Sequence, residues 1–235
     1  MKYYKTDSRK ISFREYYNIS AGIGFAFAWL YKIIGIPLKL TDGIPEPQSF
    51  RDNIVEAGTI PPPILAKLNS GILDLKQIGF DQFWFYTLKN SLIGGRSCGV
   101  QALHSSRKTV GKIIYVSYKE RQSFLFAFIS ELNRGEILAT TNHRPQFNTP
   151  PGYVVFRCVG ANATQTVQFH QNKLEEREED NPPKMIANLD QVVALDDKTS
   201  RMSFEDKTSR GVWVEMTDSE VEMLRAKFSP AQPPA

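Results

Sequence analysis

The sequence is poor in the residues from which metal and catalytic sites are usually built. Only two cysteines, Cys98 and Cys158, occur in 235 residues, and neither belongs to a CxxC pair. There are three histidines, His104, His143 and His170, and none lies at metal-ligand spacing from a cysteine. This pattern argues against a zinc site and against a disulfide framework, so we expect two thiols, or one disulfide if the chain is exported. We predict no metal and no cofactor.

Neither cysteine has a histidine placed to activate it. Cys98 and His104 are expected in one strand, six positions apart, which separates them by about 20 Å at ~3.3 Å per residue. Cys158 could meet His143 across a sheet, but its apolar neighbours lack the positive charge that favours a thiolate. We therefore expect a protein that is not an enzyme. A hydrolase-type site that is assembled only in the fold remains the alternative.

The sequence also lacks a large excess of charge of either sign. The 29 Lys and Arg residues exceed the 25 Asp and Glu residues by only four, and the sequence pI is near 9.0. A basic groove that follows phosphates needs a larger and more concentrated excess. We therefore predict no nucleic-acid partner.

The chain has one long apolar stretch, residues 19–38, which is apolar or small except for Ser20 and Lys32. Twenty residues match the span of a bilayer core, and five basic residues precede the stretch. These features predict a membrane-associated signal anchor, single-pass, with the N-terminus inside. Small residues recur every four positions and suggest a helix-packing face in lipid or a homodimer: Ser20, Gly24 and Ala28.

The same stretch has a competing interpretation as a buried helix or hairpin in the core of a soluble, cytoplasmic protein. The uninterrupted apolar run before Lys32 is short for a membrane span, and glycines at positions 22, 24 and 35 weaken an isolated helix. The domain would then be a sensory or ligand-binding domain that holds a small apolar molecule.

Short runs rich in aromatic and β-branched residues predict six strands, at residues 82–88, 97–104, 109–118, 123–132, 136–141 and 153–159. Nearly all connections are too short for a parallel crossover; only the link 142–152 is long. Helical patterns occur at residues 61–78 and 162–179. The predicted fold class is α+β, a mainly antiparallel meander of five to six strands with both flanking helices on one face and a hydrophobic helix at the N-terminus.

One strand carries aromatic residues on both faces. Alternation places Phe83 and Phe85 on one side, and Trp84 and Tyr86 on the other. Both faces of the sheet must therefore be covered, one by the core and the other by a helix, a membrane, a partner or an apolar ligand.

We divide the chain into an N-terminal segment (1–40), a linker (41–60), a core domain (61–185) and a C-terminal extension (186–235). The extension holds two nine-residue units, DDKTSRMSF at 196–204 and EDKTSRGVW at 205–213. They predict two strands of a peripheral hairpin, two copies of a docking element or a duplication in a tolerant loop. A capping box at 217–220 then predicts a short helix, and a proline-rich tail follows.

The connection between the last two predicted strands is the strongest local candidate for a binding surface. It is stiffened by prolines and rich in hydrogen-bonding groups, although these groups can equally satisfy the loop backbone. The candidate residues are Thr140, Thr141, Asn142, His143, Arg144 and Gln146. The sequence thus favours a membrane-anchored, non-enzymatic α+β module that acts through protein or lipid contacts.

Overall fold

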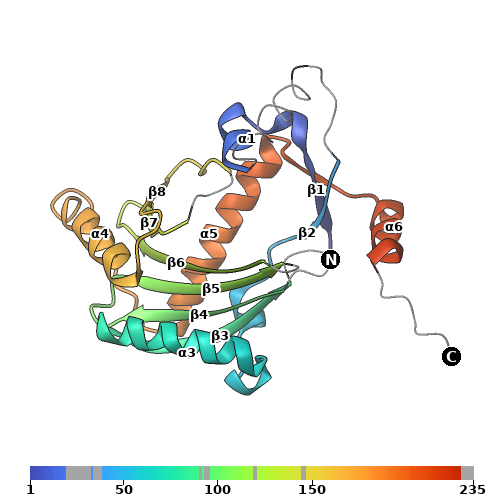
Figure 1. Cartoon of the computed structure of the whole chain (residues 1–235). Coiled ribbons are helices and arrows are strands. Elements are labelled where there is room, and N and C mark those ends of the chain that lie inside the picture. The colour runs from blue at the N-terminus through green and yellow to red at the C-terminus, as the bar shows by residue number, and fades with distance from the viewer. Residues whose placement is uncertain are drawn as a thin grey trace.

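The computed structural model describes residues 1–19, 33, 39–89, 92, 96–118, 121–143 and 147–228. Its centre is a six-stranded sheet (Figure 1) whose strands follow one another in chain order: β3 (Phe80–Lys89), β4 (Arg96–His104), β5 (Val110–Tyr118), β6 (Arg121–Glu131), β7 (Ile137–Thr141) and β8 (Tyr153–Arg157). All neighbouring pairs are antiparallel except β7 and β8. The predicted α+β meander is confirmed, and the parallel pair follows the only long predicted link, as crossover geometry requires.

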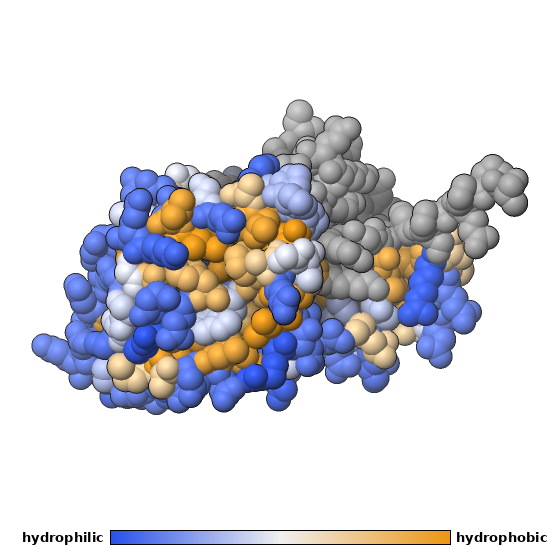
Figure 2. All heavy atoms as spheres, turned by 90° about the horizontal axis from the view of Figure 1, so that it is seen from below, coloured by the Kyte–Doolittle hydropathy of each residue, from blue (hydrophilic) through white to orange (hydrophobic). Residues whose placement is uncertain are grey.

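Two helices cover one face of this sheet. α3 (Pro62–Gln77) begins with prolines in its first turn, which need no backbone donor there, and it ends just before Gly79, whose φ is +96°. α4 (Ala163–Glu175) begins with a capping box formed by Asn162 and Gln165. Both helices pack on one cluster of buried apolar side chains with Phe83 and Phe85 at its margin. Figure 2 shows the surface of the molecule from below, where apolar side chains gather between polar ones.

The two predicted flanking helices therefore lie on one face, as expected. A third long helix, α5 (Leu189–Ser209), which the sequence did not predict, covers the opposite face. Trp84 packs against the cluster that contains Val192, and Tyr86 packs against Val193. The alternation predicted for the aromatic strand is confirmed. The cover on the second face is α5.

The nine-residue repeat lies in this helix and the turn that follows it. The prediction of a hairpin or tolerant loop for residues 196–213 was wrong, because residues 189–209 form one helix capped by Asn188. No glycine or proline interrupts these 21 residues, and their buried positions lie on the side that faces the sheet.

A second, three-stranded sheet lies near the C-terminal end of α5. Its order is β2 (Lys39–Pro45), β1 (Tyr3–Asp7) and β9 (Trp213–Glu215), with antiparallel pairing throughout. After β1 the chain forms the short helices η1 (Ser8–Lys10) and α1 (Phe13–Ile19). The predicted capping box opens α6 (Asp218–Phe228), where Thr217 Oγ1 accepts from the backbone N–H of Glu220 at 3.3 Å.

The polar segment predicted as a linker, residues 41–60, is packed on the body of the protein. It contains most of β2 and two short helices, η2 (Phe50–Asn53) and η3 (Ala57–Thr59). Phe50 is 2% exposed, and its backbone N–H donates to Asp197 Oδ1 of α5 at 2.7 Å. The segment therefore forms a strap between the small sheet and α5.

Most of the apolar stretch 19–38 lies outside the described residues, and so does the predicted helix-packing face of Ser20, Gly24 and Ala28. Within the described part of the chain, no helix has both the length and the apolar character needed to cross a bilayer. The predicted hydrophobic helix and the single-pass topology are therefore not shown.

Candidate functional site

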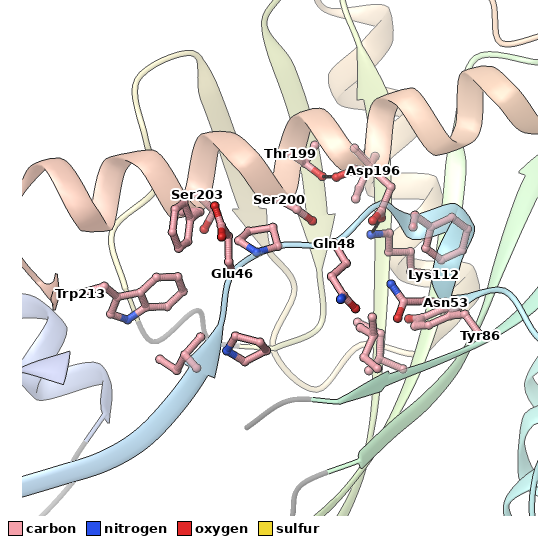
Figure 3. A pocket seen from close by; sticks show the side chains of 18 of the residues that line it. Glu46, Gln48, Asn53, Tyr86, Lys112, Asp196, Thr199, Ser200, Ser203 and Trp213 are labelled. Atoms are coloured by element: carbon pink, nitrogen blue, oxygen red, sulfur yellow. Dashed lines mark hydrogen bonds and ion pairs between the residues drawn. The ribbon is translucent and has the colours of Figure 1, made fainter. Parts of the chain in front are cut away.

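A cavity of about 510 Å³ lies between α5, the strap and the sheet (Figure 3). The sheet supplies its floor from β3, β5 and β6, and α5 supplies one wall. Most of the surface is apolar, with side chains from all of these elements: Ile44, Pro45, Leu88, Ile114, Ile129 and Phe204.

One side of the cavity carries a buried ion pair. Asp196 on α5 accepts hydrogen bonds from Lys112 Nζ on β5 and, at 2.6 Å, from Gln101 Nε2 on β4. The side chains of Lys112 and Asp196 are only 16% and 11% exposed, and Figure 3 shows them pointing toward one another. Gln101 and Lys112 are direct cross-strand partners, which places both under α5. Attraction between the two charges offsets the cost of removing them from water.

Two tyrosines contribute to the same region. Burial, together with the charge of Asp196, raises the pKa of Tyr153 to about 12. The same two causes, with burial again the larger, raise the pKa of Tyr86 well above its ordinary value. Both phenols therefore stay protonated at neutral pH. They can act as hydrogen-bond donors but not as phenolate bases.

The wall formed by α5 also presents Thr199, Ser200 and Ser203 to the cavity. Behind Ser203, the Nζ atom of Lys207 donates to Ser203 Oγ at 2.5 Å. Burial lowers the pKa of Lys207 to about 8. Sequence reasoning missed this pair. The only sequence signal for the pair is that Ser203 lies four positions before Lys207, and this spacing brings two side chains together only in a helix.

The predicted binding loop does not line this cavity at any of its described positions. Thr141 Oγ1 donates to the carbonyl oxygen of Phe126 at 2.9 Å, and Asn142 Oδ1 accepts from the N–H of the same residue at 2.9 Å. The N–H of His143 donates to Thr141 Oγ1 at 3.2 Å. The side chains of Thr141 and Asn142 thus satisfy the backbone. Arg144 and Gln146 lie outside the described residues.

Thr140, the first residue of the predicted loop site, instead lies beneath α4 beside a buried histidine. His170 is fully buried, with Nδ1 at 3.1 Å from Thr140 Oγ1 and Nε2 at 2.9 Å from Ser130 Oγ. Burial lowers the pKa of His170 to about 3, so the ring is neutral. This arrangement is a hydrogen-bonded core histidine, closed off from solvent.

The remaining candidate nucleophiles and bases are not poised for catalysis. Both cysteines are free thiols, and burial raises the pKa of Cys158, which opposes thiolate formation. Burial lowers the pKa of His104, whose Nε2 lies 3.1 Å from the carbonyl oxygen of Ile78. Among the described residues, no group of three or more His, Cys, Asp or Glu side chains could hold a metal ion.

Comparisons with known proteins identify no relative. No protein-family model matches the chain, and neither the curated proteins nor the solved structures contain a match. The function therefore has to be argued from the cavity and the side chains around it.

Proposed function

We propose that this chain is a binding module that holds a small, largely apolar molecule in the cavity under α5. The observation that carries the proposal is the cavity itself. Its volume of about 510 Å³ falls within the range of small-molecule sites, and it combines apolar walls with a few polar groups on one side.

The polar side of the cavity indicates what kind of molecule fits. Lys112 and Asp196 already neutralise one another, so a fully charged ligand group would have to break a buried ion pair. The hydroxyl group of Ser200 lies on the α5 wall, and that of Thr199, which donates to the carbonyl oxygen of Asp196, can still accept a hydrogen bond. These features favour an uncharged ligand with an apolar body and one or two hydrogen-bonding groups.

Titration with an alkyl dansylamide, a neutral fluorescent probe, tests this proposal. Wild-type protein should give a saturable rise in fluorescence. The Ser200→Phe variant places a ring in the cavity and should weaken binding at least tenfold. The matched control is Ser209→Phe, which changes the corresponding serine of the second repeat unit, an exposed position. Equal binding by both variants, with unchanged circular dichroism, would contradict the proposal.

A second candidate function, attachment to a membrane, is favoured by the segments that flank residues 19–38. β1 pairs with both β2 and β9, and Asp7 is the register partner of Lys39. Glu15, in α1, is bound by Arg210 at 2.6 Å. Residues before and after the apolar stretch thus belong to one folded body.

This shared body favours one kind of membrane attachment over another. A single pass would place the two flanks on opposite sides of a hydrocarbon core about 30 Å thick, which does not fit their pairing. An attachment that starts and ends at the same membrane surface does fit. The module would then take its ligand at that surface.

Liposome flotation tests the attachment. Full-length protein should float, and a variant with residues 20–38 replaced by a Gly/Ser linker of equal length should stay in the dense fraction with its circular dichroism unchanged. If the full chain does not float and the replacement unfolds the protein, the stretch is part of the core. On liposomes, an external protease should cleave tags at both termini equally. Protection of one tag would instead support a single pass through the membrane.

A further inference from the structure

Ser203 and Lys207 form a pair on α5 that binding alone does not require. They are four positions apart on one face of the helix, with Nζ and Oγ separated by 2.5 Å. Ser203 lines the cavity, whereas Lys207 is 8% exposed and does not line it. The hydroxyl group therefore stands between the cavity and a buried amine.

Burial opposes the charged form of Lys207. Its Nζ lies 4.5 Å from the ring centroid of Trp213 and 5.3 Å from that of Phe147, and these ring faces attract a cation and partly offset the effect of burial. The charges of Asp206 and Glu15 raise the pKa of Lys207 and that of Arg210 lowers it, and Arg210 itself pairs with both acids. No ion pair of Lys207 is formed within the described part of the chain. Burial is accordingly the largest influence on the amine, and it lowers the pKa to about 8.

We propose that Ser203 is a nucleophile, that Lys207 is its general base, and that the cavity is an acyl-transfer site for esters with a small apolar acyl group. The inference rests on the proposed function, because the substrate must occupy the same cavity. An amine that loses its proton more readily because it is buried, and that is bonded to a serine hydroxyl, is a known way to activate that hydroxyl.

The chemistry balances with water as the only co-reactant. The neutral amine of Lys207 takes the proton of Ser203 Oγ as Oγ forms a bond to the ester carbonyl carbon. The bond from that carbon to the leaving oxygen then breaks, and the ammonium returns the proton to the departing alcohol. Water next attacks the acyl carbon while one of its protons passes to Lys207. The bond from that carbon to Ser203 Oγ then breaks, Oγ takes the proton back from Lys207, and the carboxylic acid is released. The general-base step contributes a factor of about 10²–10⁴ to the rate.

The residues that line the cavity select the substrate class. The acyl chain would lie against the apolar wall that includes Phe204, the residue next to Ser203. An ester is favoured over an amide, because an alcohol leaves more readily than an amine when the ammonium of Lys207 supplies the proton.

An alkyl fluorophosphonate tests the inference directly, since an activated serine displaces its fluoride and forms a stable bond to phosphorus. Trypsin then releases residues 202–207, a peptide with a single serine, Ser203, whereas Ser200 and Ser209 fall in other peptides. We expect the adduct on residues 202–207, its loss in Ser203→Ala, and full labelling in Ser209→Ala, the matched control, whose exposed serine lies on the same helix but outside the cavity.

Two further measurements separate general-base action from packing. Lys207→Met should slow labelling at least 100-fold while alkyl dansylamide binding persists. In wild-type protein the labelling rate should rise with pH and level off above about pH 8, as the Lys207 amine loses its proton. If Lys207→Met fails to fold, the pH profile of wild-type protein alone tests whether Lys207 acts as a general base.

The outcomes distinguish the two proposals. Dansylamide binding without an adduct at Ser203 would overturn the acyl-transfer inference and leave the binding module intact. An adduct formed at an equal rate in Lys207→Met, or a rate independent of pH, would overturn the role of Lys207. Absence of both probe binding and labelling would overturn both proposals.

Discussion

The two repeat units, residues 196–204 and 205–213, contain the same run of Asp, Lys, Thr, Ser and Arg, but matching residues make different contacts. Nine residues correspond to two and a half helical turns, so matching positions point to opposite sides of α5. The first unit faces the six-stranded sheet and the strap, and the second faces the small sheet near the N-terminus. Residues that are identical in the two units therefore have different contacts, because different elements surround each unit.

The lysines show the contrast most clearly. Lys198 Nζ pairs with Glu131 at 2.8 Å and also donates to the carbonyl oxygen of Gly135 at 2.8 Å, so its charge is matched. Lys207 lies instead among aromatic rings and donates to Ser203. The lysine of the first unit thus has a partner carboxylate, whereas burial lowers the pKa of the lysine of the second unit.

The largest difference in the free energy of unfolding is expected between alanine variants of the two arginines. Arg210 contacts the carboxylate of Glu15, which is fully buried, whereas Arg201 of the first unit is exposed. Arg210→Ala would leave a buried charge without its partner and should lower the free energy of unfolding by roughly 3–5 kcal/mol. Arg201→Ala should change it by less than about 0.5 kcal/mol. Urea denaturation of the two variants measures the difference, and similar losses would mean that the two units are equivalent.

The lysines provide the second difference, through pH. The pKa of Lys207 is lower in the folded protein than its ordinary value of 10.5, so between about pH 8 and 10.5 the unfolded chain binds more protons. The free energy of unfolding should therefore rise with pH in this range. From pH 7 to pH 9.5, wild-type protein should gain roughly 2 kcal/mol relative to Lys207→Met.

Stability at pH 7 supplies the control for this experiment. Lys207→Met should be at least as stable as wild-type protein, because it removes a buried and unmatched charge. Lys198→Met should lose up to about 1 kcal/mol with its ion pair. Parallel pH curves for wild-type protein and Lys207→Met would show that burial does not perturb the amine.

The threonines provide the smallest difference. Thr199 is 5% exposed and donates to the carbonyl oxygen of Asp196 at 2.9 Å, whereas Thr208 is only partly buried near the end of the helix. Thr199→Ala should cost about 1 kcal/mol, and Thr208→Ala should cost less than about 0.5 kcal/mol. Thermal unfolding monitored by circular dichroism would rank them, and the reverse order would argue against the orientation of α5.

Local sequence signals determined much of the architecture. Prolines at the start of α3, the glycine after it and the capping box before α6 mark helix ends through their own backbone chemistry. The period-two pattern from Phe83 to Tyr86 determines which face each ring occupies, and short links enforce antiparallel pairing. Signals of this kind depend on residues a few positions apart.

Only the tertiary structure decided the role of α5 and the nature of the cavity. Most residues of the repeat are polar, so which side of the helix is buried depends on sheets that are distant in sequence. Asp196 and Lys112 are 84 positions apart, and Arg210 and Glu15 are 195 apart. Burial of Lys207 by Phe147 and Trp213 likewise arises from packing. Desolvation and charge pairing depend on what surrounds a group in space, and the order of residues along the chain does not specify those surroundings.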